Sequence, residues 1–457
     1  MMHLLTLEWQ RFRCNPLNLT IVGLFFALLL ISAVWSGLAA RELRFQAPLN
    51  QQTANNAAEM HDAKPVSNEK KESALNIANN AEPLRLPALG GLVFSVRQHY
   101  FLNTNIKVST RSRHTDGRNS DGLYNPLLQE LGLLDFSVIL ALFLPLSLIA
   151  LTYGLVQEDR ESGVWRLVCT QMAKPWRLVF AALIVRYALL WFIVFVSSSI
   201  ALLIDPNSSF LALIYWLLAV SIYLLIWLSL AGLFLLLPIS SGAAAIGLLG
   251  VWLLLTFGVP AGLTWSAEQH TPTPSRLNSI IEIRKLQEQN NQQRPALLAQ
   301  WFKDHPNITA PASLDKLNRE IANLPAGIVL DQQIRPLMMQ FEQARQKQYK
   351  YLEHRAYLSP TLALVLVADY LAGIDAPRYA RFIANINQFE DQWREFFLPL
   401  IMSDSAWTET HHQQIPQFQF HDELDNTAYW RLFMQQCLFG IMLISALYSL
   451  RRHFSRV

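Results

Sequence analysis

Long apolar stretches alternate with polar regions along the whole chain. A helix needs about 20 predominantly apolar residues to cross a bilayer. Residues 206–267 contain no charged residue and are too long for one span, and Pro238-Ile-Ser-Ser-Gly242 supplies a helix stop and a turn that divide them into two. The pattern therefore predicts six transmembrane helices, at residues 19–40, 136–156, 179–204, 210–238, 243–267 and 431–450.

Two long polar regions, 41–135 and 268–430, separate the predicted spans. In the first region, residues 51–82 are rich in Asn, Gln, Ala, Lys and Glu, a composition that predicts a flexible or loosely helical insert. Further along, the alternation of apolar and polar residues in Val93–Phe101 predicts a strand, and Ile106–Ser109 is its expected partner.

The second polar region carries helical periodicity almost throughout. We expect Arg276–Phe302 and Ile334–Tyr357 to form an antiparallel pair, with a shorter helix at Leu314–Leu324 that Ser313 caps. Another helix is predicted at Tyr379–Phe397, where the apolar residues follow one another at spacings of four and three: Phe382, Ile386, Phe389, Trp393 and Phe396. This stripe predicts a core face of the region, and the alternative is a functional surface that lines a route or docks a partner.

The placement of basic residues orients the predicted spans. Lys and Arg gather before the first span, in the connection at 157–178 and in the tail at 451–457, whereas the turn at 205–209 has none. Because basic residues favour the cytoplasmic side, both termini and the 157–178 connection are expected there. The fold class predicted is an all-α polytopic membrane protein with six transmembrane helices and two extracytoplasmic insertions, the first partly β and the second mostly helical.

The 157–178 connection is more elaborate than a turn requires. It begins with the acidic residues Glu158, Asp159 and Glu161, which complement the positive end of a helix dipole. A helical apolar face and the sequence Lys174-Pro175-Trp176-Arg177 follow. The pattern predicts a helix that lies in the membrane interface, which a membrane subunit needs if a soluble partner is to push on it.

The N-terminal residues 1–18 predict a second amphipathic helix on the same side. The apolar residues Leu5, Trp9 and Phe12 share one face, and the other face carries the polar residues Glu8, Gln10, Arg11 and Arg13. Asn15-Pro16 ends the helix. A generic membrane anchor is the simpler alternative for this segment.

Composition agrees with a membrane protein and excludes several functions. Hydrophobic residues make up 52% of the chain and charged residues 16%, and the net charge of +3 is spread out rather than gathered in a basic stripe. Nucleic acid is therefore not an expected partner. The three cysteines are Cys14, Cys169 and Cys437, all predicted to lie in the cytoplasm or in a span. The outer regions are accordingly expected to have no disulfides.

No sequence motif of an active site is present. The chain lacks a phosphate-binding Gly-x-x-x-x-Gly-Lys-Ser/Thr loop, a His-Glu-x-x-His pair and a Gly-x-Ser-x-Gly elbow. His411-His412 and His421-Asp422-Glu423 fit no metal-ligand spacing and are interpreted as solvated loop residues. Arg186 is expected to snorkel to the cytoplasmic interface. We expect a non-catalytic chain without cofactor or metal, whose energy, if it transports, comes from elsewhere.

Several blocks of residues resemble the ABC-2 type permeases, and more narrowly the subgroup with a large extracytoplasmic domain between the fifth and sixth spans. The first blocks are Glu8-Trp9-Gln-Arg11, Asn125-Pro126, Gly132-Leu-Leu-Asp135, Leu144-Pro145-Leu146, Glu158-Asp-Arg-Glu-Ser-Gly163, Gln171 and Pro175. The later blocks are Pro274-Ser275-Arg276, Leu358-Ser359-Pro360, Arg378-Tyr379 with Phe382, and Trp393-Arg394 with Phe396-Phe397 and Pro399. The resemblance extends over the chain except about 50–82.

The resemblance implies a permease subunit of an ATP-binding-cassette transporter in a bacterial inner membrane. It implies a second permease subunit, identical or related, and separate ATPase subunits that dock on the 157–178 helix and the N-terminal helix. The residues that it assigns to ATPase coupling are Glu158, Asp159, Arg160, Glu161, Gly163, Trp165, Lys174 and Pro175, together with Glu8, Trp9, Arg11 and Phe12 of the N-terminal helix. Many relatives have Thr after Glu-x-Gly, where this chain has Val164, which removes a hydroxyl cap.

Two other functions remain open from the sequence. One is an ATP-driven subunit that moves its outer domains like levers without passing a substrate through its spans. The other is a membrane-anchored scaffold or receptor with no ATPase, which would not need the 157–178 helix. Export is expected from the resemblance alone.

Overall fold

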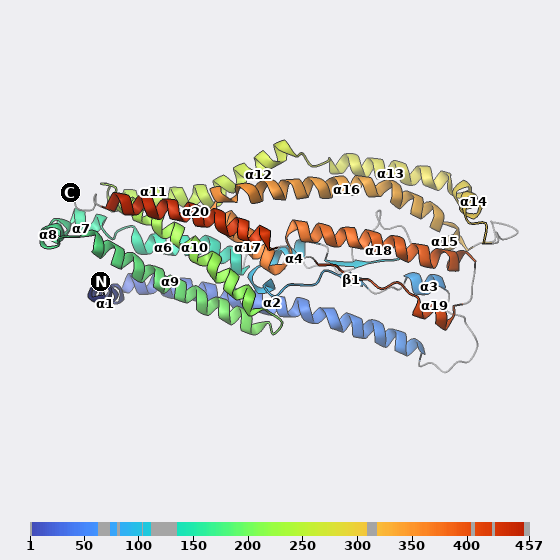
Figure 1. Cartoon of the computed structure of the whole chain (residues 1–457), viewed down its shortest axis with the longest axis horizontal. Helices are drawn as coiled ribbons and strands as arrows, with labels where there is room; N and C mark the ends of the chain where they lie inside the picture. The colour runs from blue at the N-terminus through green and yellow to red at the C-terminus, as the bar shows by residue number, and fades with distance from the viewer. Residues whose placement is uncertain are drawn as a thin grey trace.

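The computed structural model describes residues 2–62, 74–79, 83–102, 104–110, 135–308, 318–403, 407–422 and 426–451. Within these ranges the chain is almost entirely helical, with one two-stranded sheet. The molecule is elongated, with a helical bundle at the end that holds both termini and a second group of helices beyond it, which we call the distal lobe (Figure 1).

The bundle is built from the helices that hydropathy predicts. They are α2 (Pro16–Asp62), α6 (Phe136–Thr152), α9 (Trp176–Ile204), α10 (Phe210–Leu235), α11 (Ser241–Leu253) continued by α12 (Val259–His270), and α20 (Thr427–Leu450). Each belongs to a segment long and apolar enough to cross a membrane. The chain is therefore a multi-pass membrane protein, as its sequence predicts.

A seventh segment meets the same length and hydropathy criteria, at Pro360–Met402, inside the region predicted to lie outside the membrane. It consists of two helices, α17 (Pro360–Ala372) and α18 (Ala376–Met402), which Gly373 separates with its left-handed φ of 75°. At 1.5 Å per residue α17 is only about 20 Å long, short of the roughly 30 Å that the hydrocarbon layer requires. It packs between α6, α10 and α20 at the lobe end of the bundle.

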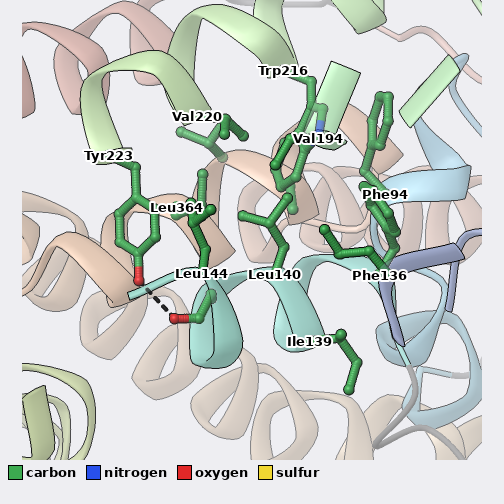
Figure 2. Close-up of a cluster of buried hydrophobic side chains, with 14 of the residues drawn as sticks. Phe94, Phe136, Ile139, Leu140, Leu144, Val194, Trp216, Val220, Tyr223 and Leu364 are labelled. Carbon is green, nitrogen blue, oxygen red and sulfur yellow. Dashed lines mark hydrogen bonds between the residues drawn. The ribbon is translucent and has the colours of Figure 1, made fainter. Parts of the chain in front are cut away.

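The core of the bundle continues into the residues that follow the first sheet strand. Phe94, in the 3₁₀ turn η1 (Leu92–Phe94), stacks on Trp216 of α10 with ring centroids 5.0 Å apart, and Phe136 of α6 lies beside both (Figure 2). All three side chains are fully buried. Aromatic packing therefore closes the bundle where the lobe begins.

Proline frees backbone carbonyls in two spans, and hydroxyl groups bind both carbonyls. Pro145 lacks the N–H that would reach Ala141 in α6, and the Tyr223 hydroxyl donates to the Ala141 carbonyl at 2.6 Å. Thr361 of α17 lies 3.2 Å from the same hydroxyl. Such substitute donors are what allow proline inside a membrane helix.

The second freed carbonyl lies in the fifth predicted span, at a π-helical turn, η3 (Leu254–Gly258), between α11 and α12. In a π-helix each carbonyl accepts from the N–H five residues further along the chain. The Val259 N–H accordingly donates to the Leu254 carbonyl. The next carbonyl, of Leu255, faces Pro260, which has no N–H. The hydroxyl of Ser359, just before α17, donates to it at 2.6 Å.

The distal lobe contains an antiparallel helix pair. The outgoing arm is α13 (Arg276–Gln292) with α14 (Arg294–Asp304), and the returning arm is α16 (Leu324–Arg355) (Figure 1). The pair is predicted, but the first arm is broken at Gln293 and the second begins at Leu324 instead of Ile334. Between the arms lies α15 (Arg319–Ala322), which Asn318 caps. The predicted cap Ser313 lies outside the described residues.

The first polar region differs from its prediction. Val93–Phe101 is not a strand: it holds η1 and the short helix α4 (Arg97–Phe101). The sheet pairs β1 (Pro83–Arg85) with β2 (Asn105–Lys107), so only the second predicted strand is found, with Leu84 opposite Ile106. The consecutive residues Val93 and Phe94 are both buried. The alternation of apolar and polar residues therefore does not reflect a strand with one buried and one solvated face.

The predicted insert at 51–82 is partly regular. The helix α2 continues through Asp62, and a short helix, α3 (Ala74–Asn79), follows. Residues 63–73 and 80–82 of the insert lie outside the described residues. The helical alternative for this segment therefore holds for the parts that the structure describes.

The aromatic stripe of α18 is a core face. Phe382, Ile386, Phe389 and Trp393 are buried, and Phe396 is partly buried against them. The stripe packs on the two arms of the helix pair, through α14 and α16, and also on α3 and the segment 407–420. The Trp393 indole N–H donates to the Ala78 carbonyl of α3 at 3.1 Å, which ties the two polar regions together.

Candidate functional site

The connection predicted to be one coupling helix is two short helices at the end of the bundle that holds the termini (Figure 1). They are α7 (Gln157–Glu161) and α8 (Val164–Gln171), and Gly163 joins them with a left-handed φ of 80°. A Cβ on Gly163 would meet no atom within 4 Å, so the backbone conformation, not space, favours glycine there. The prediction of a continuous helix is wrong for this reason.

The helix α7 is fastened to the end of α10. The buried Gln157 side chain donates through Nε2 to the Phe234 carbonyl at 3.0 Å, and Arg160 donates to the Leu237 carbonyl at 2.8 Å. The last carbonyls of a helix have no partner within it. These two side chains therefore satisfy the end of one span and hold α7 against it.

Glu161 makes the corresponding contact with the start of α11. Its carboxylate accepts from the Ser241 N–H at 2.7 Å and from the Ser241 hydroxyl at 3.1 Å. A carboxylate at a helix N-terminus also meets the positive end of the helix dipole. The same short helix thus holds the end of the fourth predicted span and the beginning of the fifth.

A third contact joins α7 to the N-terminal helix α1 (Met2–Cys14). Arg11 of α1 forms a salt bridge with Asp159 at 3.2 Å. Both residues were predicted to belong to the site. They lie far apart in the sequence, and the structure brings them together. The pair is partly exposed, which limits its contribution to stability to about 0–1 kcal/mol.

The N-terminal helix ends at Cys14, before Pro16, as predicted, but it is turned differently from the prediction. Glu8 lies on the buried face with Phe12, one helical turn away, whereas Trp9 is 44% exposed. Burial raises the pKa of the Glu8 carboxyl, and the positive charges of Arg11 and Arg186 oppose that rise. Placing Glu8 on the solvated face was therefore wrong.

Arg186 of α9 is buried beneath this helix instead of reaching the interface. Its guanidinium donates to the Leu151 carbonyl at 2.6 Å and to the Ala182 carbonyl at 3.0 Å, and it lies 5.5 Å from the centre of the Phe12 ring. The prediction of a snorkelling side chain is contradicted. Arg186 therefore connects α6, α9 and α1, and protein groups instead of bulk water surround its charge.

The remaining predicted residues divide into exposed and buried. Glu158 and Lys174 are exposed, while Trp165 and Pro175 are buried. Trp165 packs in a cluster with Val156 of the preceding turn and side chains of α9, α10 and α20. On the outer side of α8, Val164 is 46% exposed and Leu167 58% exposed. We call α1, α7 and α8 the platform: a fastened underside with a mixed charged and apolar outer face.

Gln157, Arg186 and Ser241 make decisive platform contacts that sequence reasoning did not assign. Arg186 carried a signal, since it is a charge inside a predicted span, and such residues face the protein interior. Gln157 and Ser241 carried none, because a glutamine after a span and a serine in a turn are ordinary.

Neither the platform nor the histidine-rich segment forms a metal site among the residues that the structure describes. Asp422, which the sequence placed near His421, forms a salt bridge with Arg378 of α18 at 2.6 Å. Its carboxylate is therefore already paired. Glu423 lies outside the described residues.

Residues 276–421 match the model of a family described as a domain of unknown function, DUF3526. This match runs from the start of α13 to the segment after α19 (Glu409–Gln413), and it therefore covers most of the distal lobe and α17 but not the platform. No curated protein and no solved structure matches the chain.

Proposed function

We propose that this chain is the permease subunit of an ATP-binding-cassette transporter, an exporter of a bacterial inner membrane, which a separate ATPase drives. The observation that carries the proposal is the fastening of α7. Its side chains hold the end of α10, the start of α11 and the N-terminal helix at once. A force applied to so short an element reaches two spans and the N-terminal helix, which is what a coupling element must achieve.

The outer face of the platform suits a protein partner. It offers Glu158 and Arg166 as exposed charges of opposite sign, with Val164 and Leu167 as exposed apolar side chains between them. Charged groups around apolar ones are typical of specific interfaces. The proposed docking surface therefore includes α8, while Trp165, Pro175 and Glu8 act from inside by holding the platform in place.

The proposed topology has six spans with both termini in the cytoplasm and the distal lobe outside. In it α17 is a short helix inserted at the outer end of the bundle, and not a seventh span. The resemblance to ABC-2 type permeases also supports a second copy or a related permease subunit beside this one. The chain itself contributes no ATP hydrolysis.

Co-expression with a candidate ATPase tests this function. We expect the ATPase to co-purify with the chain in detergent and its ATP turnover to rise several-fold over that of the ATPase alone. The control is a chain without residues 1–14, which lacks the contact between Arg11 and Asp159. A chain that purifies alone with every candidate ATPase would support the scaffold alternative.

The lever alternative is favoured by one observation. The helix α17 and Ser359 before it are hydrogen-bonded to the fourth and fifth predicted spans, through Tyr223 and Leu255, so the lobe is fixed to the bundle at its base. Spans that tilt would move the lobe with them. ATP-driven motion of the lobe without substrate movement in reconstituted vesicles would select this alternative.

Thiol labelling tests the proposed topology. In a background without Cys14, Cys169 and Cys437, we expect Gln292→Cys to react with an impermeant maleimide in intact cells. Lys174→Cys should react only after permeabilisation, because the basic residues favour the cytoplasm for its loop. Both positions are exposed, so access from the correct side alone decides reactivity. Labelling of Lys174→Cys in intact cells contradicts the proposed orientation.

A further inference from the structure

A groove in the distal lobe lies between the middle of α18 and the extended segment 415–421. It encloses a hollow of about 180 Å³. Eight residues line it, six of them polar and two aromatic: Asn385, Gln388, Gln392, Gln417, Gln419 and His421, with Phe389 and Phe418. The groove is remote from the platform, and the matched family of unknown function includes both its walls.

The first wall is one face of α18. Asn385, Gln388 and Gln392 are spaced three and four residues apart, and residues at these spacings lie above one another on a helix. Asn385 is half-buried and the two glutamines are exposed. The neighbouring face of α18 carries the buried aromatic stripe, from which Phe389 reaches the hollow, so the orientation of this wall is fixed by the core.

The second wall is the extended segment, in which alternate side chains point to opposite sides. Gln417, Gln419 and His421 are exposed, whereas Phe418 and Phe420 turn toward α18. The Phe418 ring meets Phe389 edge-on at 5.4 Å, and Phe420 meets Phe382 at 5.7 Å. These contacts hold the segment in place and give the groove an apolar floor.

A salt bridge closes the end of this segment. Arg378, buried at the start of α18, binds Asp422 immediately after His421 at 2.6 Å. Together with the two phenylalanine anchors, it fixes the segment, and with it the three polar residues that line the hollow on this side. The groove is thus preformed.

The polar side chains of both walls are free to bind a ligand. None of the six makes a side-chain hydrogen bond to another residue in the part of the chain that the structure describes. Each of the five amides offers two N–H donors and a carbonyl acceptor, and the imidazole offers one donor and one acceptor when neutral. The lining carries no Asp, Glu, Lys or Arg, which favours a neutral ligand over an ion or a charged peptide.

We infer that this groove binds a neutral glycan. A pyranose ring carries hydroxyl groups around its rim, each a donor and an acceptor, and apolar C–H groups on its faces. Amides on two sides of the hollow match the rim, and the floor of Phe389 and Phe418 matches a face. A peptide strand would instead bind through its main-chain N–H and C=O groups to an exposed backbone edge.

Binding measurements on the full chain test the inference without any ATPase, and so independently of the proposed transport. The protein is purified in a polyoxyethylene detergent, because detergents with sugar headgroups would compete. Calorimetric titration is made with maltotriose, with the trisaccharide of N-acetylglucosamine and with tri-alanine. We expect saturable binding of at least one trisaccharide and none of tri-alanine.

Two double variants remove one wall each: Gln388→Ala with Gln392→Ala, and Gln417→Ala with Gln419→Ala. Each should weaken trisaccharide binding at least about tenfold, because two hydrogen bonds to the ligand are lost. Gln340→Ala is the matched control, an exposed glutamine on α16 away from the groove, and should leave binding unchanged. Circular dichroism spectra that match the wild type show that the variants are folded. Weaker binding by either double variant is enough to support the inference.

A last arm distinguishes the source of the glycan. Dodecyl maltoside carries a sugar on an alkyl chain, and it should bind more tightly than maltotriose if the natural ligand is a lipid-linked glycan. Comparable affinities point to a free or polymeric glycan. The inference is overturned if neither trisaccharide binds, if tri-alanine binds in their place, or if the wall variants bind as tightly as the Gln340→Ala control.

Discussion

Trp393→Ala is expected to lower the stability of the distal lobe by about 3–5 kcal/mol, the usual cost of deleting a large buried aromatic side chain. The indole is 6% exposed and packs against Phe397 and Phe389, with ring centroids 4.5 Å and 5.7 Å away. Its N–H also holds the Ala78 carbonyl of α3. The change therefore leaves a cavity in the core and an unpaired carbonyl at the same time. Limited proteolysis of the lobe in increasing urea measures the effect.

Trp393→Phe separates the two contributions. It keeps the six-membered ring but loses the hydrogen bond to Ala78 and the volume of the pyrrole ring, so we expect a loss of about 1–2 kcal/mol, smaller than that of Trp393→Ala. Expression, protease resistance and transport should fall together in Trp393→Ala. If that variant is as protease-resistant as the wild type and hydrolyses ATP with its partner but no longer moves substrate, the stripe is a functional surface and not a core.

Reversing charge on the platform is expected to abolish stimulated ATP turnover. The simple variant, Glu158→Lys with Glu161→Lys, changes two things, because Glu161 also holds the start of α11 through Ser241. Glu158→Lys with Glu161→Gln is the sharper variant, since the glutamine carbonyl can still accept from the Ser241 N–H. At a docking surface such a reversal replaces attraction by repulsion, and turnover should fall to that of the isolated ATPase.

The control is Lys285→Glu, a charge reversal on an exposed residue of α13 in the distal lobe. It should leave both co-purification and turnover unchanged. All variants must reach the membrane in equal amounts, as quantified by immunoblotting. Full stimulation by the Glu158→Lys, Glu161→Gln variant would remove the platform from the proposed interface.

The predicted spans correspond closely to helices because the bilayer imposes one requirement that a sequence displays directly, a run of apolar residues of fixed length. The helix α17 escaped prediction for the same reason: a helix of thirteen residues is too short for a span, and polar regions bound it. The first part of the misassigned strand, residues 93–96, is buried in the core between bundle and lobe. Alternation indicates a strand only where one face meets water.

The position of the platform could be predicted from charge and apolar periodicity, but its geometry could not. Acidic residues between two spans indicated a special connection, and the docking of Arg11 on Asp159 agrees with their joint assignment. The sequence did not show that Gly163 would divide the connection or that Gln157 would reach the end of α10. These features depend on backbone groups exposed at the ends of other helices, which leave no mark in the composition of the segment that binds them.

The π-helical turn at Leu254–Gly258 lets one membrane segment face two partners. Each residue advances a helix by about 100°, so one additional residue rotates everything beyond it by that angle. Before the turn, α11 packs on α6 and α10; after it, α12 packs on α16, with Ser266 and Tyr351 hydroxyls 2.5 Å apart. A strictly regular helix of the same sequence would direct Ser266 away from Tyr351. The additional residue thus sets which face of α12 meets α16. Insertion or deletion of one residue in this segment would turn that face away.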